Sequence, residues 1–469
     1  RLKKYNVKAK LIKFNLTDKK LFKPIKNFGD SIYIYNGNNI GRENIYGKEY
    51  YEKIVEMFKE INFIYSVNLN KNYEQMPDVY KKCFLGLRLT KNDGNANTVQ
   101  EMGAMNIPVI HNGEEINSIK WETLTDIELN IIYRNIDLFV NNIKNFKNIL
   151  FLCSDYPSYG GAATNCLSII KFLELKGIKC NGLFFTGLNN LDISNLNFGD
   201  NIKLVNINKK EEYIKNYIKN MNIDLIIFRN FIKNLSLEKL KIFSIPIYFM
   251  IPGIFEPHLD KHYYNIKDKK EMDKYIHKEI IKYIKIADYS YCASYHTIKI
   301  LKKYYNLKVK NLYFNYFPFY GKFIKTFNNF ENRKYDYAVI VSNFKRKVKN
   351  IDNIVKYLKI ISEKKRKRKI KILFIGKNCL EYDFDKVRCI ELIKNHYVKR
   401  YYKEIKYIVQ DSFYESCSNV YVEGRFDGCK IINCKELIEL NNLNFREVEN
   451  YEKEKLEKEK LEKEKLEKE

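Results

Sequence analysis

The sequence predicts an α/β protein in which parallel sheets are covered by helices, and two observations support this prediction. Short apolar segments rich in Ile, Tyr and Phe alternate with longer segments of helical period along most of the chain. Loops that contain glycine separate several of the predicted strands from the helix that follows. With 469 residues, the chain is long enough for several domains.

Residues 1–145 are predicted to form one Rossmann-like half. The alternation of apolar and amphipathic segments gives strands and helices in turn. The predicted strands are 31–36, 63–69, 84–90 and 107–112. The predicted helices are 48–61, 76–83 and most of 114–145.

Residues 146–330 and 331–440 are predicted to form two further halves of the same kind, joined by an aromatic crossover at 311–321. Strands are expected at 148–155, 181–187, 202–207, 223–230, 245–253, 337–342, 371–376 and 407–412. Helices are expected at 166–177, 270–286, 350–365 and 398–405.

Residues 441–469 form a charged, low-complexity tail in which a leucine recurs every five residues. That spacing places the leucines on different faces of a helix, so the tail is not predicted to form a coiled coil.

One arrangement of polar residues occurs twice in the chain. In "DSFYESCSNVYVEGRFDGCKII", which begins at Asp411, Glu415 and Glu423 stand eight positions apart. In "NDGNANTVQEMGAMNIPVI", which begins at Asn92, Asp93 and Glu101 have the same separation. When these acids are aligned, an asparagine and two apolar strand residues also coincide, at Asn97 with Asn419 and at 109–110 with 431–432.

The later stretch combines a strand end, a polar turn and a helix start. Ser418 or Asn419 is expected to cap a helix that runs to about Phe426, with Glu423 in its first two turns. The amides at such a helix start attract phosphate, and nearby carboxylates accept hydrogen bonds from sugar hydroxyls. A nucleotide sugar offers both partners. A purely structural cap with an acid that favours the helix dipole remains the alternative.

Four segments resemble the retaining GT-B glycosyltransferases of family 4, in the order that this family has them. They are "GGAATN" from 160, "ADYSYCASYHTIKIL" from 287, "VSNFKRKVKNID" from 341 and "FYESCSNVYVEGRFDGCKII" from 413. The resemblance implies a GT-B fold for 146–440, with an acceptor-side half followed by a donor-binding half. Residues 1–145 resemble a second, partial copy of the donor-binding half.

The resemblance also implies roles for single residues. Glu423 would hold the ribose of the donor, Glu415 the hydroxyls of the transferred sugar, and Lys349 and Arg346 the donor diphosphate. The other donor-site residues would be Ser418, Asn419, Gly160 and Gly161. The partial copy would have a second donor-type site at Asp93, Asn97 and Glu101, and His258 would contact the acceptor.

The sequence departs from the family pattern at two places in the later copy. Phe344 stands where the family has an arginine five residues before its lysine. Lys430 follows Gly428 and Cys429, where the family usually has proline after glycine. The earlier copy keeps Pro108 before its strand but has Asp93 in place of the first glutamate. Which copy is active is therefore open.

Composition limits the partners and the compartment. The net charge is +27, but the lysines are spread along the chain rather than grouped, which argues against specific nucleic-acid binding and is compatible with an anionic small ligand. No apolar segment is long enough to span a membrane, although peripheral contact is compatible with the charge. The ten cysteines lack paired close spacing, and no signal peptide opens the chain, so a cytoplasmic protein is expected.

The sequence as a whole predicts a hexosyltransferase-type glycosyltransferase that uses a nucleotide-sugar donor and a glycan, lipid or protein acceptor. By resemblance it would be retaining and independent of metal, with no further cofactor. His258 and His262 have the spacing of two metal ligands on a helix, but no third ligand is evident. The alternatives are a decayed scaffold that binds sugar or nucleotide and, less favoured, a basic nucleic-acid-binding protein.

Overall fold

The structure is a computed structural model of the whole chain. It describes residues 17–37, 41, 43–90, 96–154, 161–186, 200–206, 210–232, 235–252, 278–324, 329–345, 349–364, 370–391, 395–412 and 418–443.

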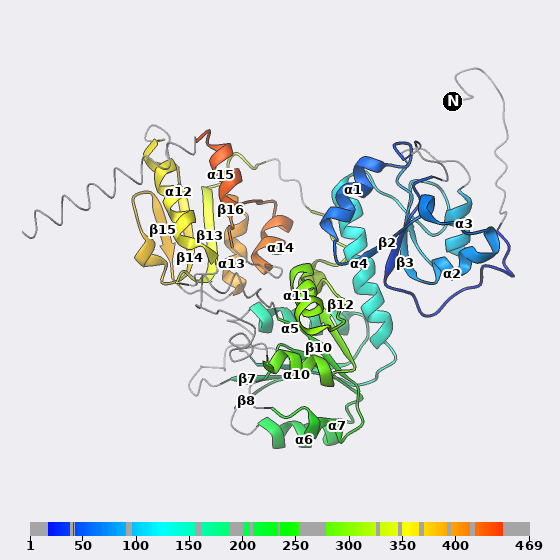
Figure 1. Cartoon of the computed structure of the whole chain (residues 1–469). Coiled ribbons are helices and arrows are strands. Elements are labelled where there is room, and N and C mark those ends of the chain that lie inside the picture. Colours follow the sequence, from blue (N-terminus) through cyan, green and yellow to red (C-terminus); the bar gives the residue numbers. More distant parts are fainter. Residues whose placement is uncertain are drawn as a thin grey trace, which may run out of the picture. The chain divides into compact units, whose positions relative to one another are not determined.

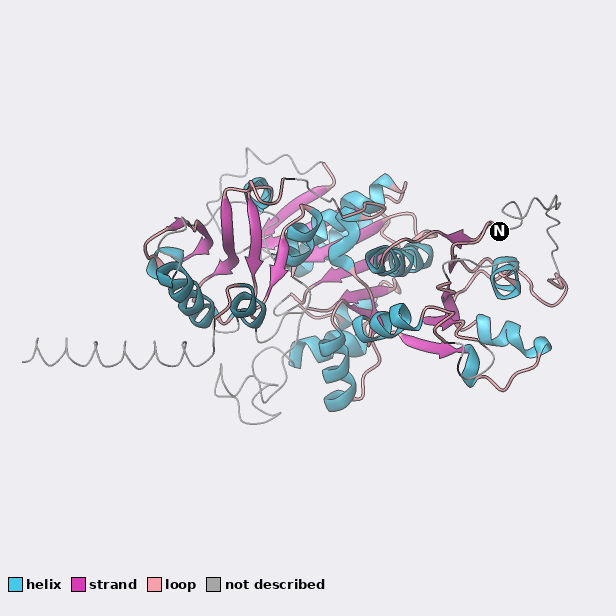
Figure 2. Cartoon of the chain, turned by 90° about the horizontal axis from the view of Figure 1, so that it is seen from above, coloured by secondary structure: helices cyan, strands magenta, loops and turns pink. Residues whose placement is uncertain are grey.

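Contacts between residues divide the chain into two compact units. The first unit comprises the residues up to Asn145 together with Asn311–Tyr316, and the second comprises Phe146–Lys310 and the residues from Phe317 onwards. Three separate sheets run through these units, and helices flank their strands (Figures 1 and 2). We call them the first, middle and last sheets.

The first sheet has the strand order β2-β1-β3-β4-β5, and every neighbouring pair is parallel. Its strands are β1 (Ser31–Ile34), β2 (Asn62–Tyr65), β3 (Cys83–Leu87), β4 (Val109–Ile110) and β5 (Ser118–Ile119). Its helices are α1 (Lys48–Met57), α2 (Met76–Tyr80), α3 (Asn97–Ala104) and α4 (Leu124–Ile143). The residues of β1 and β3 are buried throughout, as expected of strands covered on both faces.

The middle sheet has the strand order β12-β11-β10-β9-β6-β7-β8. Its strands are β6 (Ile149–Cys153), β7 (Cys180–Thr186), β8 (Ile202–Asn206), β9 (Leu225–Arg229), β10 (Ile247–Met250), β11 (Tyr289–Cys292) and β12 (Lys310–Asn311). Its helices are α5 (Gly161–Leu175), α6 (Lys210–Asn220), α7 (Glu238–Lys241), α10 (Lys278–Ile286) and α11 (Tyr295–Tyr305). The chain enters the sheet at the interior strand β6, continues to one edge through β7 and β8, and returns to the other side of β6 with β9.

The last sheet has the strand order β15-β14-β13-β16-β17, again with parallel neighbours. Its strands are β13 (Tyr335–Asn343), β14 (Ile372–Lys377), β15 (Val387–Ile390), β16 (Ile405–Val409) and β17 (Lys430–Ile432). Its helices are α12 (Ile351–Lys364), α13 (Asn395–Tyr402), α14 (Asn419–Phe426) and α15 (Cys434–Leu440). The α/β fold predicted from the sequence is confirmed by these three sheets.

The first and last sheets each contain a strand–helix–strand segment of the same layout, and the two segments align without a gap. Strand β3, helix α3 and strand β4 correspond to β16, α14 and β17 at a constant offset along the chain. The register of pairing is also the same, because Gly86 pairs with Val109 in one sheet and Ile408 pairs with Ile431 in the other. The repeat in the sequence is therefore a repeat of structure.

At one contact between the helix and the strand, the large residue is on the helix in one copy and on the strand in the other. In the first sheet a side chain at Gly86 would meet Met102 of α3, with its Cβ only 2.7 Å from the Met102 sulfur. In the last sheet the strand carries Ile408 and the helix carries Gly424, whose added Cβ would lie 2.5 Å from the Ile408 Cδ1. Each copy thus keeps one bulky and one absent side chain at the same contact.

The segment Asn311–Tyr316, which begins at the last residue of β12, belongs to the first unit. The Tyr313 hydroxyl donates to the Glu60 carboxylate, and the Asn135 side chain donates to the Asn311 carbonyl at 3.1 Å and accepts from the Tyr313 amide at 3.3 Å. These contacts build Asn311–Tyr316 into the first unit after the whole of the middle sheet has intervened in the sequence.

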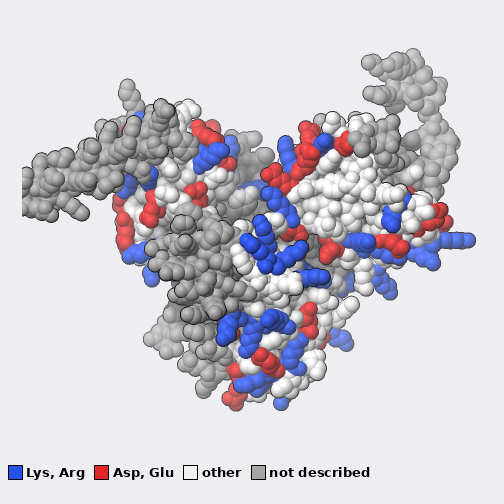
Figure 3. All heavy atoms as spheres, viewed as in Figure 1, with Lys and Arg blue, Asp and Glu red and all other residues white. Residues whose placement is uncertain are grey.

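The basic side chains on the described surface are not gathered in a single patch. In Figure 3, the Lys and Arg side chains of the described residues lie at several separate places on the face shown, with Asp and Glu among them. This distribution agrees with the even spread of lysine in the sequence. In the described part of the chain, every helix is too short or too polar to cross a bilayer.

The exchange of bulky residues gives a test of the repeat. Gly424→Met should lower the free energy of unfolding by about 1–3 kcal/mol, because the new side chain is forced against Ile408. Ile408→Gly alone should also destabilise the protein by leaving a cavity. The double variant should lose less stability than the two single losses together, as urea unfolding would measure. Simple additivity of the two effects would contradict a compensating contact.

Candidate functional site

The carboxyl edge of the last sheet has a switch point between β13 and β16. The chain leaves β13 toward β14 on one side and returns through β16 on the other. In open parallel sheets this crevice is where ligands bind. Two sets of sequence-predicted residues flank it, because Lys349 follows β13 and the described residues Ser418, Asn419 and Glu423 follow β16.

Helix α14 begins and ends where the sequence indicates. Ser418 is its N-cap, and the Ser418 Oγ accepts a hydrogen bond from the Tyr421 amide at 3.3 Å. The Gln410 side chain donates to the same oxygen at 3.1 Å and so ties the end of β16 to the helix start. Gly428, with a φ of 76°, lies just beyond the helix in the left-handed conformation that favours glycine.

Glu423 is held inside the second unit by two partners. Its side chain is only 17% exposed, and it accepts a hydrogen bond from the Tyr402 hydroxyl at 3.0 Å. The Lys399 ammonium lies 3.7 Å from its other oxygen. Burial raises the pKa of Glu423 above its ordinary value, while Lys399 and Tyr402 oppose that rise. The result is a fixed carboxylate in the second turn of α14.

Lys349 lies in a loop that is tied to the other side of the switch point. Its neighbour Asn350 donates to the Asp411 carboxylate at 2.7 Å, and Asp411 follows β16. The other Asp411 oxygen accepts from the Cys434 amide at 3.2 Å, at the start of α15. The structure therefore brings the lysine loop and the glutamate motif to the same edge.

Asn419 and Gly161 also meet. The Asn419 side chain donates to the Gly161 carbonyl at 3.2 Å, where Gly161 is the first residue of α5 in the middle sheet. A Cβ on Gly161 would lie 3.6 Å from the Asn419 nitrogen, which is ordinary contact. Close approach therefore does not require glycine at this position.

Phe344 has a structural role. It is 1% exposed and packs against Phe374 and Tyr382, with ring centroids 5.3 and 5.5 Å away. The position at which the family has a cationic residue is thus part of the hydrophobic core here. Lys349 and Arg346 were predicted to bind the donor diphosphate, and of these two the structure describes Lys349.

Several predicted residues lie outside the described residues. They are Glu415, Arg346, Gly160, Asp93, His258 and His262. Their assignments stay predictions.

The first unit has a matching glutamate. The Tyr80 hydroxyl donates to Glu101 at 2.7 Å, and both side chains are buried. Burial raises the pKa of Glu101, while Tyr80 and the nearby Arg88 guanidinium oppose that rise. Tyrosine and glutamate are 21 residues apart here, as Tyr402 and Glu423 are in the second unit.

The tyrosine that donates to the glutamate in each unit, Tyr80 or Tyr402, is the site residue that the sequence analysis did not identify. The aligned acids of the two copies already placed Tyr80 on Tyr402, so extending the gapless alignment toward the N-terminus would have found the pair. A tyrosine alone carries no signal in a chain that has 38 of them.

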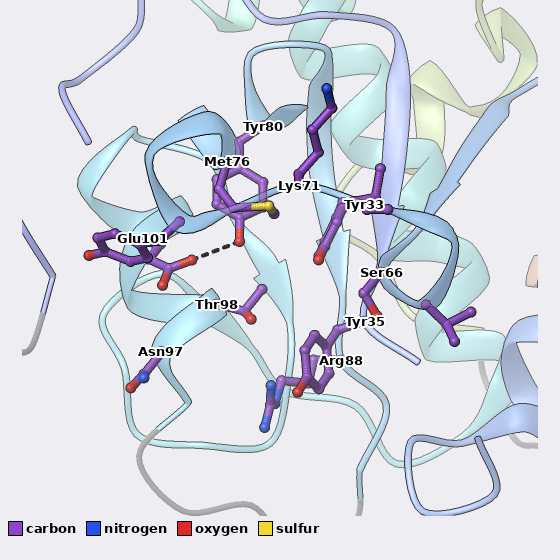
Figure 4. Close-up of a pocket in the computed structure, with 13 residues that line it drawn as sticks. Tyr33, Tyr35, Ser66, Lys71, Met76, Tyr80, Arg88, Asn97, Thr98 and Glu101 are labelled. Carbon is purple, nitrogen blue, oxygen red and sulfur yellow. Dashed lines mark hydrogen bonds between the residues drawn. The ribbon is translucent and has the colours of Figure 1, made fainter. Parts of the chain in front are cut away.

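A pocket of about 550 Å³ opens at the carboxyl ends of β1, β2 and β3 in the first unit. Figure 4 shows the Tyr80 hydroxyl and the Glu101 carboxylate facing each other, and Arg88 beside Tyr35. The predicted residue Asn97 lines the same pocket. The lining residues are Tyr33, Tyr35, Ser66, Val67, Leu69, Lys71, Tyr73, Met76, Tyr80, Arg88, Asn97, Thr98 and Glu101.

The described residues contain no group of three or more His, Cys, Asp or Glu side chains that could hold a metal ion.

Comparisons with known proteins give remote likenesses of structure. No protein-family model matches the sequence, and no curated protein matches it. Among solved structures, sucrose-phosphate synthase from Thermosynechococcus elongatus is 14% identical, with 61% of this chain and 81% of that chain covered at a TM-score of 0.43.

Two further structures are similar to a comparable degree. The pneumococcal O-GlcNAc transferase GtfA, in complex with UDP and GlcNAc, is 8% identical, with 61% of this chain and 84% of that chain covered at a TM-score of 0.46. UDP-GlcNAc 2-epimerase from Methanocaldococcus jannaschii is 14% identical, with 61% and 83% covered at a TM-score of 0.40. The α/β fold of the chain rests on its own sheet topology.

The Tyr402–Glu423 hydrogen bond predicts a pH-dependent loss of stability. Tyr402→Phe removes a donor from the buried carboxylate, so the pKa of Glu423 should rise further above its ordinary value of 4.5. A raised pKa means that the folded state binds the proton more tightly, so the loss of stability grows as pH rises through that pKa. We expect a loss of about 1–3 kcal/mol at pH 7.5 and little near pH 4.5, measured by urea unfolding.

The neighbouring variant Tyr401→Phe is the matched control, because Tyr401 is half-buried on the same helix and the hydroxyl that donates to Glu423 is that of Tyr402. An equal loss at both pH values for Tyr402→Phe would argue that the hydroxyl does not stabilise the ionised carboxylate.

Proposed function

We propose that the protein is a glycosyltransferase that moves a sugar from a nucleotide-sugar donor to an acceptor hydroxyl. The second unit would carry out the transfer. The observation that supports the proposal concerns Glu423: this largely buried carboxylate lies on the helix that follows β16 at the switch point of a parallel sheet. Lys349 follows β13, the other strand of the switch point.

The chemistry of these groups suits a nucleotide sugar. A carboxylate that Tyr402 and Lys399 hold in place can accept hydrogen bonds from the two hydroxyls of a ribose. Lys349, at the facing loop, can supply positive charge to a diphosphate. A ligand that combines a diol and a diphosphate would engage both sides of the switch point at once.

In the proposed reaction, the acceptor oxygen bonds to the anomeric carbon as the bond from that carbon to the diphosphate breaks. The proton of the acceptor hydroxyl passes to the departing diphosphate. Charge develops on the diphosphate, so cationic groups and helix amides near it lower the barrier. Positioning of the two substrates supplies the rest. We further propose retention at the anomeric carbon and no metal requirement, which rest on the family resemblance of the sequence alone.

Replacement of Glu423 tests the proposal. Glu423→Gln should weaken binding of the donor by about tenfold or more and reduce transfer and donor hydrolysis, because the amide cannot accept a diol pair as the carboxylate does. Binding would be measured by calorimetry after a panel of nucleotide sugars has been screened by thermal stabilisation of the full chain.

The exposed Glu439, on α15, provides the control variant Glu439→Gln. Unchanged donor affinity in Glu423→Gln would refute the proposed site. Donor binding that is lost in Glu423→Gln, but with no sugar transfer or hydrolysis in the unaltered protein, would instead indicate a binding protein.

A further inference from the structure

We infer that Cys379 and Cys389 form an oxidation site, at which hydrogen peroxide joins the two thiols in a disulfide that loosens the loop leading to Lys349. The pair lies in the last sheet, on strands away from the switch point. Formation of the disulfide does not depend on the proposed function, whereas its effect on donor binding rests on that function.

The two thiols come from neighbouring elements. Cys379 begins the short 3₁₀ helix η8 (Cys379–Tyr382), which follows β14, and Cys389 lies on β15, the edge strand beside β14. The Cys389 Sγ donates to the Cys379 carbonyl oxygen at 3.4 Å and is within hydrogen-bonding reach of the Cys379 thiol. Both are free thiols, so the two sulfurs are neighbours before any oxidation takes place.

The two thiols differ in their access to solvent, which sets the order of reaction. Cys389 is half-buried, so a small oxidant can reach its sulfur, whereas Cys379 is fully buried in the hydrophobic core. The Cys389 sulfur attacks one peroxide oxygen, which gives a sulfenic acid and one water. The Cys379 sulfur then attacks the sulfenic sulfur, so that the disulfide forms and a second water leaves. Two thiols and one peroxide thus give one disulfide and two waters.

The surroundings of Cys389 keep its thiol protonated. The Asp383 carboxylate lies 3.8 Å from the Cys389 Sγ. Burial, the Cys379 thiol and the Asp383 carboxylate raise the pKa of Cys389 to about 12. Because the thiolate is the reactive form, the first step is slow at neutral pH. The pair therefore suits sustained oxidation rather than the rapid turnover of a catalytic cysteine.

Helix η8 holds the first residues of the loop that follows β13. Its contacts with that loop are the Asn378 amide donating to the Asn343 side chain at 2.9 Å, the Tyr382 hydroxyl donating to the Phe344 carbonyl at 3.5 Å, and the Lys345 ammonium 2.6 Å from the Glu381 carboxylate. The loop continues from there to Lys349. A disulfide requires the Cys379 sulfur to turn toward β15, so η8 moves and these contacts weaken.

The first unit has the same connection without the thiol pair. There Ser66, at the start of the 3₁₀ helix η2 (Ser66–Asn68) that follows β2, donates to the Asn36 side chain at 3.0 Å. Cys83 is the one cysteine of the first unit. A 3₁₀ helix in this place therefore does not need two thiols for its structure. The pair occurs in the copy whose loop carries Lys349.

The experiment is treatment of the full chain with excess hydrogen peroxide, followed by peptide mass spectrometry without reduction. The disulfide between Cys379 and Cys389 should form, and a thiol reductant should reverse it. Amide hydrogen exchange at Phe344 should become about tenfold faster in the oxidised protein, because this amide donates to Lys377, two residues before η8. The affinity for the nucleotide-sugar donor should fall about tenfold, as calorimetry would measure.

Cys389→Ser keeps a donor for the Cys379 carbonyl but cannot form the disulfide, so peroxide should change neither exchange nor affinity in this variant. Cys83→Ala removes a buried cysteine of the first unit and is the control that retains the pair. The inference is overturned if this disulfide does not form, if exchange at Phe344 stays unchanged when it does, or if Cys389→Ser responds as the unaltered protein does. A disulfide with faster exchange in a protein that binds no nucleotide sugar would support the oxidation site and refute the proposed function alone.

Discussion

A carboxylate that is removed from water needs hydrogen-bond donors, and a tyrosine meets this need in both the first and the last sheet. The donor comes from the helix before a central strand and the acceptor from the helix after it, as Tyr402 and Glu423 show. One bond therefore ties the two helices across the strand between them. Two further predicted site residues lie on the same helix as this pair, since Ser418 caps the helix and Asn419 begins it.

The pair is kept while its surroundings differ. The first unit retains Tyr80 and Glu101 but exchanges the strand and helix residues that pack beneath them, so that Gly86 lies under Met102 where Ile408 lies under Gly424. Such an exchange preserves the distance between helix and strand, because the summed volume at the contact stays similar. The position of the glutamate relative to its tyrosine is thus kept by similar packing, although the core residues beneath the pair differ.

Local signals in the sequence predicted the fold well. The bounds of α14 follow from Ser418 as cap and Gly428 as the residue that ends the helix, and both act over a single turn. The sequence predicted Asn97 and Glu101 of the first-unit pocket, but the other lining residues could not be predicted, because most of them come from the ends of three strands that are far apart in the sequence. Arg88 carried no signal either, since a lone arginine in an apolar strand segment reads as a strand end. The burial of Phe344 likewise depends on neighbours, Phe374 and Tyr382, that only the folded sheet supplies.

The return of Asn311–Tyr316 to the first unit has a consequence for synthesis of the protein. Tyr313 and Asn311 supply hydrogen bonds to Glu60 and Asn135, which the ribosome has made long before. Burial raises the pKa of Glu60, and Tyr313 opposes that rise, so the later segment supplies a donor to a buried carboxylate of the first unit. The first unit cannot complete its packing until the middle sheet has been translated. Vectorial folding of this chain is therefore interleaved, with the first unit begun early and closed late.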